Sequence, residues 1–475
     1  MGWSQGVTVG IFVGLIILVG GYFLLRLFIG WVFDQVFMRI SMDPYWENLF
    51  ATHNYAARFS SGEQVETELR SSTKPLPQRP FGARRILSPW DSIFFNPVYL
   101  DRLPLREANQ VETAVVIGPA AARPLRVEIP ILIGGMAYGT ALSALAKQAL
   151  AIGATKAGTA TNTGNGACLE QERAAAERLI VQYSRSSWGT NPDLIRNANA
   201  VEIQFGQGAW GAAPVKVPVQ RIMNHARLRQ VLGISPKEPA EVSSRLPGVG
   251  CRSDLRSLVE ELRGETNGVP IGVKIGATHR LEKELPNFLE AGVDFISIDG
   301  AEGGTHGGAT VLDSVGIPTL HALVRARRFL NTHDSERAVS LLVGGGLTGP
   351  GSFLKALALG ADAVFIGTAA LLAVVHTQAT KILPWEPPIS LVFFEGKHSK
   401  RLNPFAGAES LARFLKNCVQ EMRTIALVVG RDHLSEIKPS DLCSTNAKIA
   451  EWLEIPWVGS APREEFDDTV KNQCY

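Results

Sequence analysis

The feature of this sequence that most constrains its fold is a series of eight short apolar runs between residues 130 and 367, most of them separated by helix-like segments. Such alternation predicts βα units and a parallel sheet. Eight units in succession favour an α/β fold closed into a (βα)8 TIM barrel, with a doubly wound open sheet as the alternative. The predicted strands are Pro130–Gly134, Ala154–Gly158, Leu179–Tyr183, Val201–Phe205, Ile271–Ile275, Phe295–Asp299, Leu341–Gly345 and Val364–Gly367.

Helix-like segments follow most of these runs, as βα alternation requires. The stretch between the fourth and fifth runs, Gly206–Pro270, is long and predicts an insertion with its own helix at Ser253–Arg263. A further helix is predicted beyond the barrel at Ser410–Arg423. The helices predicted between strands are Ala141–Ile152, Glu170–Arg178, Pro192–Ala198, Arg280–Ala291, Leu320–Leu330 and Gly351–Leu359.

The N-terminal segment differs in kind from the rest of the chain. Residues Val7–Leu25 carry no charge and are numerous enough to cross a hydrocarbon core. No basic residue precedes this run and no clear cleavage site follows it, which disfavours a cleaved signal peptide; a buried core helix is the alternative. We expect an uncleaved single-pass membrane anchor, with Arg26 and Arg39 favouring a cytoplasmic location for the catalytic domain that follows.

Four regions are expected along the chain. A transmembrane anchor at 7–33 precedes an N-terminal extension at 34–128, which is punctuated by the proline-rich segment Lys74–Pro80. The barrel is expected at 129–382 and a C-terminal extension at 383–475.

Composition argues against several classes of function. The chain has 47 basic and 45 acidic residues and no basic run, so nucleic-acid binding has little electrostatic support. The histidines show no metal-ligand spacing and the cysteines no Cys-x-x-Cys motif, so we predict no metal site and no cysteine-held cluster. Without a disulfide framework, a reducing compartment is expected. The cysteines are Cys168, Cys251, Cys418, Cys443 and Cys474.

The last two predicted strands both end in glycine. Val343–Gly346 closes one run and Gly367-Thr368 closes the next, with the helix-like segment Phe353–Leu359 between them. Glycine lets backbone N–H groups approach an anion, and a following helix N-terminus adds its dipole. In (βα)8 barrels the loops after the last two strands usually hold a phosphate. A phosphorylated cofactor or substrate is therefore predicted at this position.

Polar and glycine-rich segments follow other predicted strands as well. Each one alone is typical of a turn. All of them, however, lie at the carboxyl ends of strands, the face on which barrel enzymes place their sites. Their coincidence predicts an active site built from Gly134–Gly139, Thr159–Gly166, Glu202–Ala209 and Asp299–Gly308.

Two residues of this face are candidate catalytic groups. Lys274 lies within an apolar strand, and a buried charge needs a partner. We expect it to face an anionic or electron-rich ligand, such as the N1–C2=O edge of a reduced flavin, and the alternative is a structural ion pair with Glu202 or Asp299. His306 lies in a glycine run and is a candidate proton donor, or else a loop histidine bonded to backbone.

Together these motifs resemble the FMN-binding synthase domain of glutamate synthases. Over Ile129–Leu372 they read Gly-Met-Ala-Tyr-Gly, Asn-Thr-Gly-x-Gly, Val-Glu-Ile-x3-Gln-Gly-Ala, Val-Lys, Gly-Gly-Thr, Gly-Gly-Leu and Gly-Ala-Asp-x4-Gly-Thr-Ala-Ala-Leu. The resemblance implies a barrel that holds FMN and delivers a hydride from reduced FMN to an imine. The FMN contacts that it implies are Met136, Ala137, Thr161, Asn162, Gln204, Gln207, Lys274, Gly303, Gly304, Thr305, Gly345, Gly346, Gly367 and Thr368.

The sequence departs from the family pattern at several positions. Asn165 and Ala167 stand where the family has Glu and Gly, and Gln204 stands where it has lysine. Val375–Pro384 lacks the cysteines that hold the family's iron–sulfur cluster, so electron supply through that cluster is not expected. A glutaminase domain is not expected in this chain either.

The expected function is therefore that of a membrane-anchored FMN-dependent oxidoreductase, which transfers a hydride to an imine or similar small substrate and has a separate electron donor as partner. The alternative is a non-catalytic flavin- or phosphate-binding barrel with a structural or sensing role at the membrane, motivated by Asn165, the lost cluster and the anchor. Another FMN barrel, such as a 2-hydroxy-acid oxidase or a type 2 isopentenyl diphosphate isomerase, shares the phosphate loops but lacks a matching His-Arg pattern here.

Overall fold

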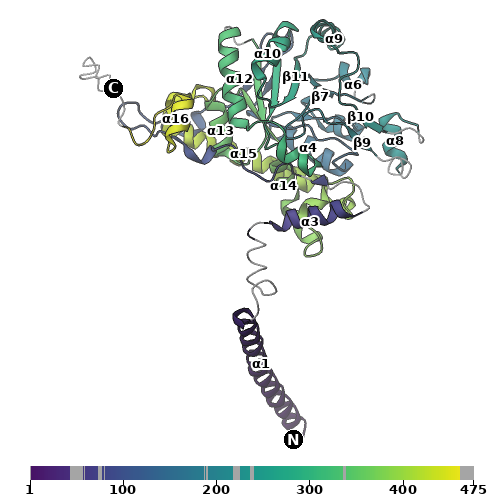
Figure 1. Ribbon diagram of the computed structural model, residues 1–475, viewed down its shortest axis with the longest axis vertical. Coiled ribbons are helices and arrows are strands. Elements are labelled where there is room, and N and C mark those ends of the chain that lie inside the picture. The colour runs from purple at the N-terminus through teal and green to yellow at the C-terminus, as the bar shows by residue number, and fades with distance from the viewer. Residues whose placement is uncertain are drawn as a thin grey trace. The chain divides into compact units, whose positions relative to one another are not determined.

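Figure 1 shows the computed structural model, which describes residues 2–42, 57, 59–72, 78–79, 81–186, 188, 191–217, 225–235, 240–334 and 338–460. The chain forms two compact units, Met1–Pro77 and Gln78–Tyr475. This boundary divides the predicted extension at 34–128, so its residues from Gln78 onward belong to the same unit as the barrel.

The described part of the first unit is helical. Helix α1 (Gly2–Met42) contains the predicted anchor, and its segment Phe12–Met38 is long and apolar enough to cross a membrane by length and composition, with a mean hydropathy of 2.3. Apolar side chains along this segment are exposed, for example Leu18 at 74%. Helix α3 (Ser61–Ser71) begins with a capping box that satisfies its first backbone donors.

An eight-stranded parallel sheet forms the centre of the second unit. Its strands lie in the order β5-β15-β14-β12-β11-β8-β7-β6. If the two ends of this order are joined, the strands follow one another around a circle in the order in which they occur along the chain. The two ends of that order meet, because the Ile133 N–H donates to the Ala160 carbonyl at 3.0 Å and the Thr159 hydroxyl donates to the Ile131 carbonyl at 2.6 Å. The predicted (βα)8 barrel is confirmed. Its strands are β5 (Ile131–Ile133), β6 (Thr161–Asn162), β7 (Leu179–Tyr183), β8 (Ala200–Gln204), β11 (Ile271–Gly276), β12 (Phe295–Asp299), β14 (Ser340–Gly344) and β15 (Ala363–Ile366).

Helices follow the strands and cover the outside of the barrel (Figure 1). The helix predicted in the insertion is α9 (Arg252–Glu265), and the helix beyond the barrel is α15 (Pro404–Val429), which extends further than predicted at both ends. The helices predicted between strands are all present, with ends that differ by up to a few residues. The barrel helices are α4 (Ala144–Lys156), α5 (Glu170–Ala175), α6 (Pro192–Arg196), α10 (Leu281–Glu290), α11 (Ala309–Ser314), α12 (Thr319–His333), α13 (Pro350–Ala358) and α14 (Thr368–Val375).

The prediction of a strand at Ala154–Gly158 is wrong. The first three of these residues complete α4, which begins after its N-cap Ser143. Alanine and lysine favour helix, and the chain leaves the helix at Gly158 with a φ of +70°, in the left-handed region that suits glycine. The strand β6 begins at Thr161, after this turn.

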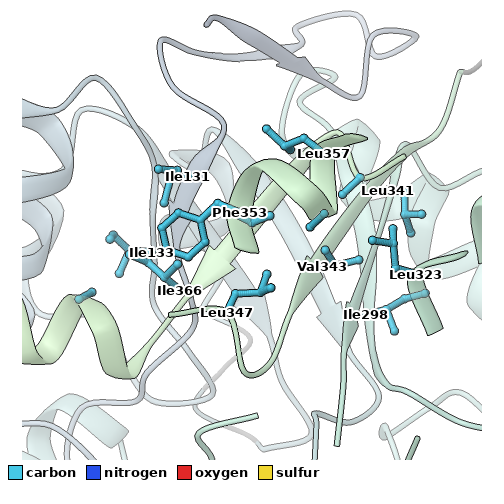
Figure 2. Packing of buried hydrophobic residues seen from close by; sticks show 14 of the residues in the cluster. Ile131, Ile133, Ile298, Leu323, Leu341, Val343, Leu347, Phe353, Leu357 and Ile366 are labelled. Carbon is cyan, nitrogen blue, oxygen red and sulfur yellow. The ribbon is translucent and has the colours of Figure 1, made fainter. Parts of the chain in front are cut away.

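Successive residues of each strand face opposite sides of the barrel wall. One set packs against the helices, which explains why the strands read as continuous apolar runs. Figure 2 shows this outer layer, in which Phe353 of α13 lies against Ile133 and Ile366, and Leu323 of α12 lies near Ile298. Burial of each such side chain contributes about 1.5–3 kcal/mol.

The other set of strand residues faces the barrel axis. At the amino ends of the strands it is apolar, and the hairpin of β3 (Val115–Ile117) and β4 (Leu125–Val127) packs against it and closes that end of the barrel. Nearer the carboxyl ends of β6, β7, β8, β11 and β12, the side chains that face the barrel axis are polar. This polar inner layer consists of Asn162, Gln182, Glu202, Gln204, Lys274, Ser297 and Asp299.

Short elements outside the barrel complete the second unit. The insertion carries the antiparallel pair β9 (Val215–Val217) and β10 (Ala240–Val242) with α8 (Ala226–Leu232). The N- and C-terminal extensions meet in the pair β2 (Ile93–Phe95) and β16 (Leu442–Ser444), which precedes α16 (Ala447–Leu453). The remaining pair is β1 (Gln78–Arg79) with β13 (Gly307–Gly308), and the 3-10 turns are Trp90–Ser92, Ala108–Gln110, His376–Lys381, Pro388–Leu391, Ser399–Arg401, Leu434–Glu436 and Pro439–Asp441.

Candidate functional site

The carboxyl ends of the strands open into two adjoining cavities. The inner cavity, of about 180 Å³, lies at the barrel mouth and is lined by Lys274, Asp299 and the loops after β5 and β12. The outer cavity, of about 660 Å³, lies beside the loops after β14 and β15 and reaches α15. The two cavities share part of their lining, namely Phe81, Gly304, Gly345, Phe365, Gly367 and Thr368.

Most of the predicted site residues surround the inner cavity. Thr161, Asn162 and Gln204 do not, because they are buried and line neither cavity. Gly346 lines the outer cavity only. The contact of each residue with a cofactor stays a prediction. The predicted residues on the inner lining are Met136, Ala137, Gln207, Lys274, Gly303, Gly304, Thr305, His306, Gly345, Gly367 and Thr368.

Lys274 is buried on β11, and its Nζ lies 2.9 Å from Asp299 Oδ2 on the neighbouring strand β12. Burial by itself lowers the pKa of Lys274, but the carboxylates of Asp299 and Glu202 outweigh burial and raise the pKa above its ordinary value. The ammonium group therefore stays charged beneath the cavity. The ion pair expected as the structural alternative is present, and the same lysine also lines the inner cavity.

A second carboxylate lies in the polar inner layer. Glu202 Oε1 accepts hydrogen bonds from Asn162 Nδ2 at 3.0 Å and from Gln182 Nε2 at 2.7 Å. Gln204 Nε2 donates to Gln207 Oε1 at 3.1 Å. Asn162 and Gln204 thus order side chains beneath the inner cavity, and Gln207 is the member of this set that reaches its lining.

His306 is exposed and lines the inner cavity. Residues from the N-terminal extension hold its loop, because β1 pairs with Gly307–Gly308 and the Gly82 N–H donates to the Thr305 carbonyl at 3.0 Å. An exposed imidazole in a held loop can exchange protons with solvent. The role of His306 as a proton donor stays a prediction.

The loops after β14 and β15 present backbone to the cavities. Gly345 and Gly346 have φ values of +105° and +70°, and a Cβ on Gly345 would lie 2.9 Å from the Gly300 nitrogen. Gly367 is the N-cap of α14 and makes no side-chain cap, and a Cβ there would meet no atom nearer than the Met136 sulfur at 4.0 Å. The first N–H groups of α14 have no intrahelical acceptor, so this end of the helix suits an anion.

Sequence reasoning missed Lys147, a buried lysine of α4. Its Nζ donates to the carbonyl oxygens of Met136 at 2.8 Å, Asn162 at 3.0 Å and Thr163 at 3.1 Å, and it lies 2.9 Å from Glu172 Oε1. Lys147 thereby joins the loop after β5 to the loop after β6. The signal that the sequence offered was a single lysine on the apolar, inward-facing side of a helix.

Glu302 was missed as well. Its carboxylate accepts from the backbone N–H groups of Leu87 and Ser88, from the Ser88 hydroxyl at 3.0 Å, and from the Thr319 N–H and hydroxyl at 2.9 Å and 2.8 Å. It fixes the N-terminal extension to the loop after β12 and to α12. The extension also brings Phe81, with a φ of +68°, to the lining of both cavities. A local sequence pattern does not predict contacts between residues that are more than 200 positions apart, such as Leu87 and Glu302.

The family profile and the curated relatives point to one family. Residues 95–432 match the family profile described as the conserved region in glutamate synthase. The glutamate synthase large subunit-like protein of Rhizobium meliloti (strain 1021) is 33% identical over 438 residues, which cover 88% of this chain and 98% of that protein. The archaeal-type glutamate synthase (NADPH) of Thermotoga neapolitana is 30% identical over 365 residues, 74% of this chain and 69% of that protein. Among solved structures, a flavocytochrome b2 variant with benzoylformate aligns with 83% of this chain and 86% of its own, at 17% identity and a TM-score of 0.49.

The matched region contains all eight barrel strands and every residue of the inner cavity outside the N-terminal extension. It therefore confirms the resemblance read from the motifs, and it supports FMN as the cofactor. The chain belongs to the glutamate synthase family.

Proposed function

We propose that this chain is a membrane-anchored, FMN-dependent oxidoreductase that interconverts an amine and an imine of a small substrate. An oxidoreductase barrel follows from its family. The observation that supports the FMN site and its reaction is the inner cavity, which is lined by the charged Lys274 and by the backbone of Gly345 and Gly367.

The lining of the cavities fits FMN. The glycine loops and the open N-terminus of α14 suit the phosphate. The segment Gly134–Ala137 offers backbone and mostly small side chains on which a flat ring can rest. Lys274 suits the edge of the ring that becomes negative on reduction. We therefore expect FMN to extend from the inner cavity to the Gly345–Gly346 loop.

FMN, when bound, supplies hydride transfer. The protein's own residues provide the electrostatics and the proton. Lys274 is held by Asp299 at 2.9 Å, so it stabilises negative charge beside it without reorganising during the reaction. His306 is exposed on the same lining, where it can give a proton to the substrate nitrogen.

The membrane anchor in this proposal is α1. Its exposed apolar side chains and its length support insertion into a bilayer. With the second unit in the cytoplasm, a C-terminal tag should be protected from protease in spheroplasts. Digestion of the second unit from outside would overturn this orientation.

A second candidate function is a non-catalytic barrel that keeps its flavin for a structural or sensing role. Two observations favour it: Asn165 lines the inner cavity where the family has glutamate, and Asp299 already neutralises Lys274. Photoreduction of the flavin followed by mixing with imines, with quinones or with oxygen separates the two functions. Turnover faster than that of free FMN with any acceptor would exclude the non-catalytic role.

The test of the cofactor uses the full chain purified in detergent. It should be yellow and release FMN on denaturation. Gly345→Ala should lose flavin, because its φ and the nearby Gly300 nitrogen leave no room for a Cβ, whereas Gly351→Ala, with no atom within 4 Å of the added carbon, should retain it. A colourless wild-type protein that takes up no FMN would end the proposal.

A further inference from the structure

The outer cavity extends beyond the glycine loops to the groove between α14 and α15. Leu372 and Ala373 of α14 and Phe414 of α15 make this part of its wall apolar. Leu372 is 55% exposed although it belongs to a cavity wall. Exposed apolar side chains in a concave space favour a ligand with an apolar body.

Ser410 lies on this part of the lining, and so do three larger polar side chains: His376, Arg413 and Asn417. Within the described part of the chain, Arg413 forms no ion pair, and its hydrogen bond to Ser410 Oγ is long, at 3.4 Å. No described residue accepts from or donates to the His376 or Asn417 side chain. All three can donate a hydrogen bond to a neutral acceptor such as a carbonyl oxygen.

The outer cavity adjoins the proposed flavin site. Gly345, Phe365 and Thr368 line both spaces, and Phe81 lies at the same boundary. A ligand between α14 and α15 would therefore lie next to the bound cofactor, with Phe365 on the boundary between the ligand and the flavin site.

We propose that the outer cavity binds the head group of a lipid-soluble quinone, which exchanges electrons with the flavin; this rests on the proposed function. A quinone ring is flat and apolar and carries two carbonyl oxygens, which matches apolar walls bearing isolated donors. A chain anchored through α1 meets such a molecule at high local concentration. The segment Val375–Pro384 offers no cysteine for a cluster that would carry electrons instead.

The electrons and protons of this step balance. Oxidation of the amine to the imine releases two electrons and two protons, which pass through the flavin. The quinone takes up two electrons and two protons and becomes the quinol, so the flavin returns to its starting state. The reverse direction, from quinol to imine, uses the same balance.

The experiment measures binding of menadione to the full chain in detergent by equilibrium dialysis, alongside the flavin content of each sample. Arg413→Ala and Leu372→Glu should each weaken menadione binding at least tenfold. Lys416→Ala removes a positive charge from the same helix outside the lining and should leave binding unchanged. All three variants should keep their flavin. The rate at which menadione reoxidises the photoreduced flavin should fall in parallel with binding.

Several results of this experiment would overturn the quinone site. A yellow wild-type protein that does not bind menadione overturns the quinone site and leaves the proposed function intact. Binding that neither Arg413→Ala nor Leu372→Glu weakens overturns it as well. A colourless protein refutes the proposed function and with it the electron transfer, whereas menadione binding to that protein still reports on the cavity.

Discussion

Two of the described lysines of the barrel are buried, and their surroundings differ. Lys147, behind the loops after β5 and β6, has three backbone carbonyls and Glu172 within hydrogen-bond distance. Lys274, beneath the inner cavity, has Asp299 as its one polar partner at that distance among the described residues, and its Nζ lies 5.4 Å from the Phe365 ring centroid.

An ammonium group has three donors. All three are used at Lys147, so this lysine has no donor left for a ligand, and its effect is to hold two loops together. At Lys274 two donors are left over on the lining of a cavity, where an electron-rich ligand can accept them. The difference separates a lysine that builds the site from one that we expect to act in it.

The largest expected effect belongs to Lys147→Met, which leaves the fully buried Glu172 without its ion pair. Breaking a buried pair from one side destabilises a protein by roughly 3–5 kcal/mol. We expect a loss of this size in the free energy of unfolding of the second unit, measured by urea titration, together with weaker flavin retention. Lys147→Met/Glu172→Gln should recover part of the loss.

Lys156→Met is the matched control on the same helix. Lys156 pairs with Glu409, but both side chains are about half exposed, so solvent screens the pair and it contributes little to stability. If the two lysine variants lose equal stability, Lys147 does not have the structural role assigned here.

The barrel could be predicted from sequence because most of its strands are short apolar runs that glycine or polar residues follow. The run Ala154–Gly158, which was predicted as a strand, is the exception, because it is rich in residues that favour helix and its first three residues belong to α4. The prediction ended the second strand at Gly158, whereas β6 is Thr161–Asn162, so two residues predicted for the loop lie in the strand itself.

The cavity could be predicted only where it is built from strand ends. Lys147 is a single lysine on the apolar side of a helix, and this pattern does not show which carbonyl oxygens or carboxylate it contacts. Phe81 and Glu302 reach the cavities through contacts between the N-terminal extension and the loop after β12. The outer cavity depends on how α15 packs beside α14, which periodicity does not reveal.

Lys274→Met tests the other lysine. It leaves Asp299 unpaired beside a cavity that admits water, so we expect about 1–3 kcal/mol of lost stability, less than for Lys147. The flavin potential should fall by about 20–45 mV, because a charge worth roughly 1–2 kcal/mol to the reduced form is removed. Spectroelectrochemistry measures this change. An unchanged potential would make Lys274 a structural residue like Lys147.

Asp299→Asn should shift the flavin potential in the opposite direction. Removing the carboxylate leaves the Lys274 charge less compensated, which favours the reduced flavin, so the potential should rise. We expect an increase smaller than the decrease in Lys274→Met, because Glu202 still offsets part of the lysine charge. A decrease in both variants would mean that the pair acts through the fold rather than through its charge.

The smallest expected effect lies at the surface, where Asp313 forms a two-point contact with Arg79 of β1 at 2.8 Å for each oxygen. Hydrogen bonding to Arg79 holds the pKa of Asp313 below its ordinary value of about 3.9. A lowered carboxyl pKa stabilises the fold above the ordinary value, and the stabilisation is lost as the pH falls through the folded value. Because about a third of the Asp313 side chain is exposed, we expect Asp313→Asn to lose only about 1 kcal/mol of stability at pH 7.

Thermal unfolding from pH 7 to pH 3 should show the difference in stability between wild type and Asp313→Asn shrinking below about pH 4. A difference that persists unchanged at pH 3 would show that the Asp313 charge does not hold β1 over the loop of His306.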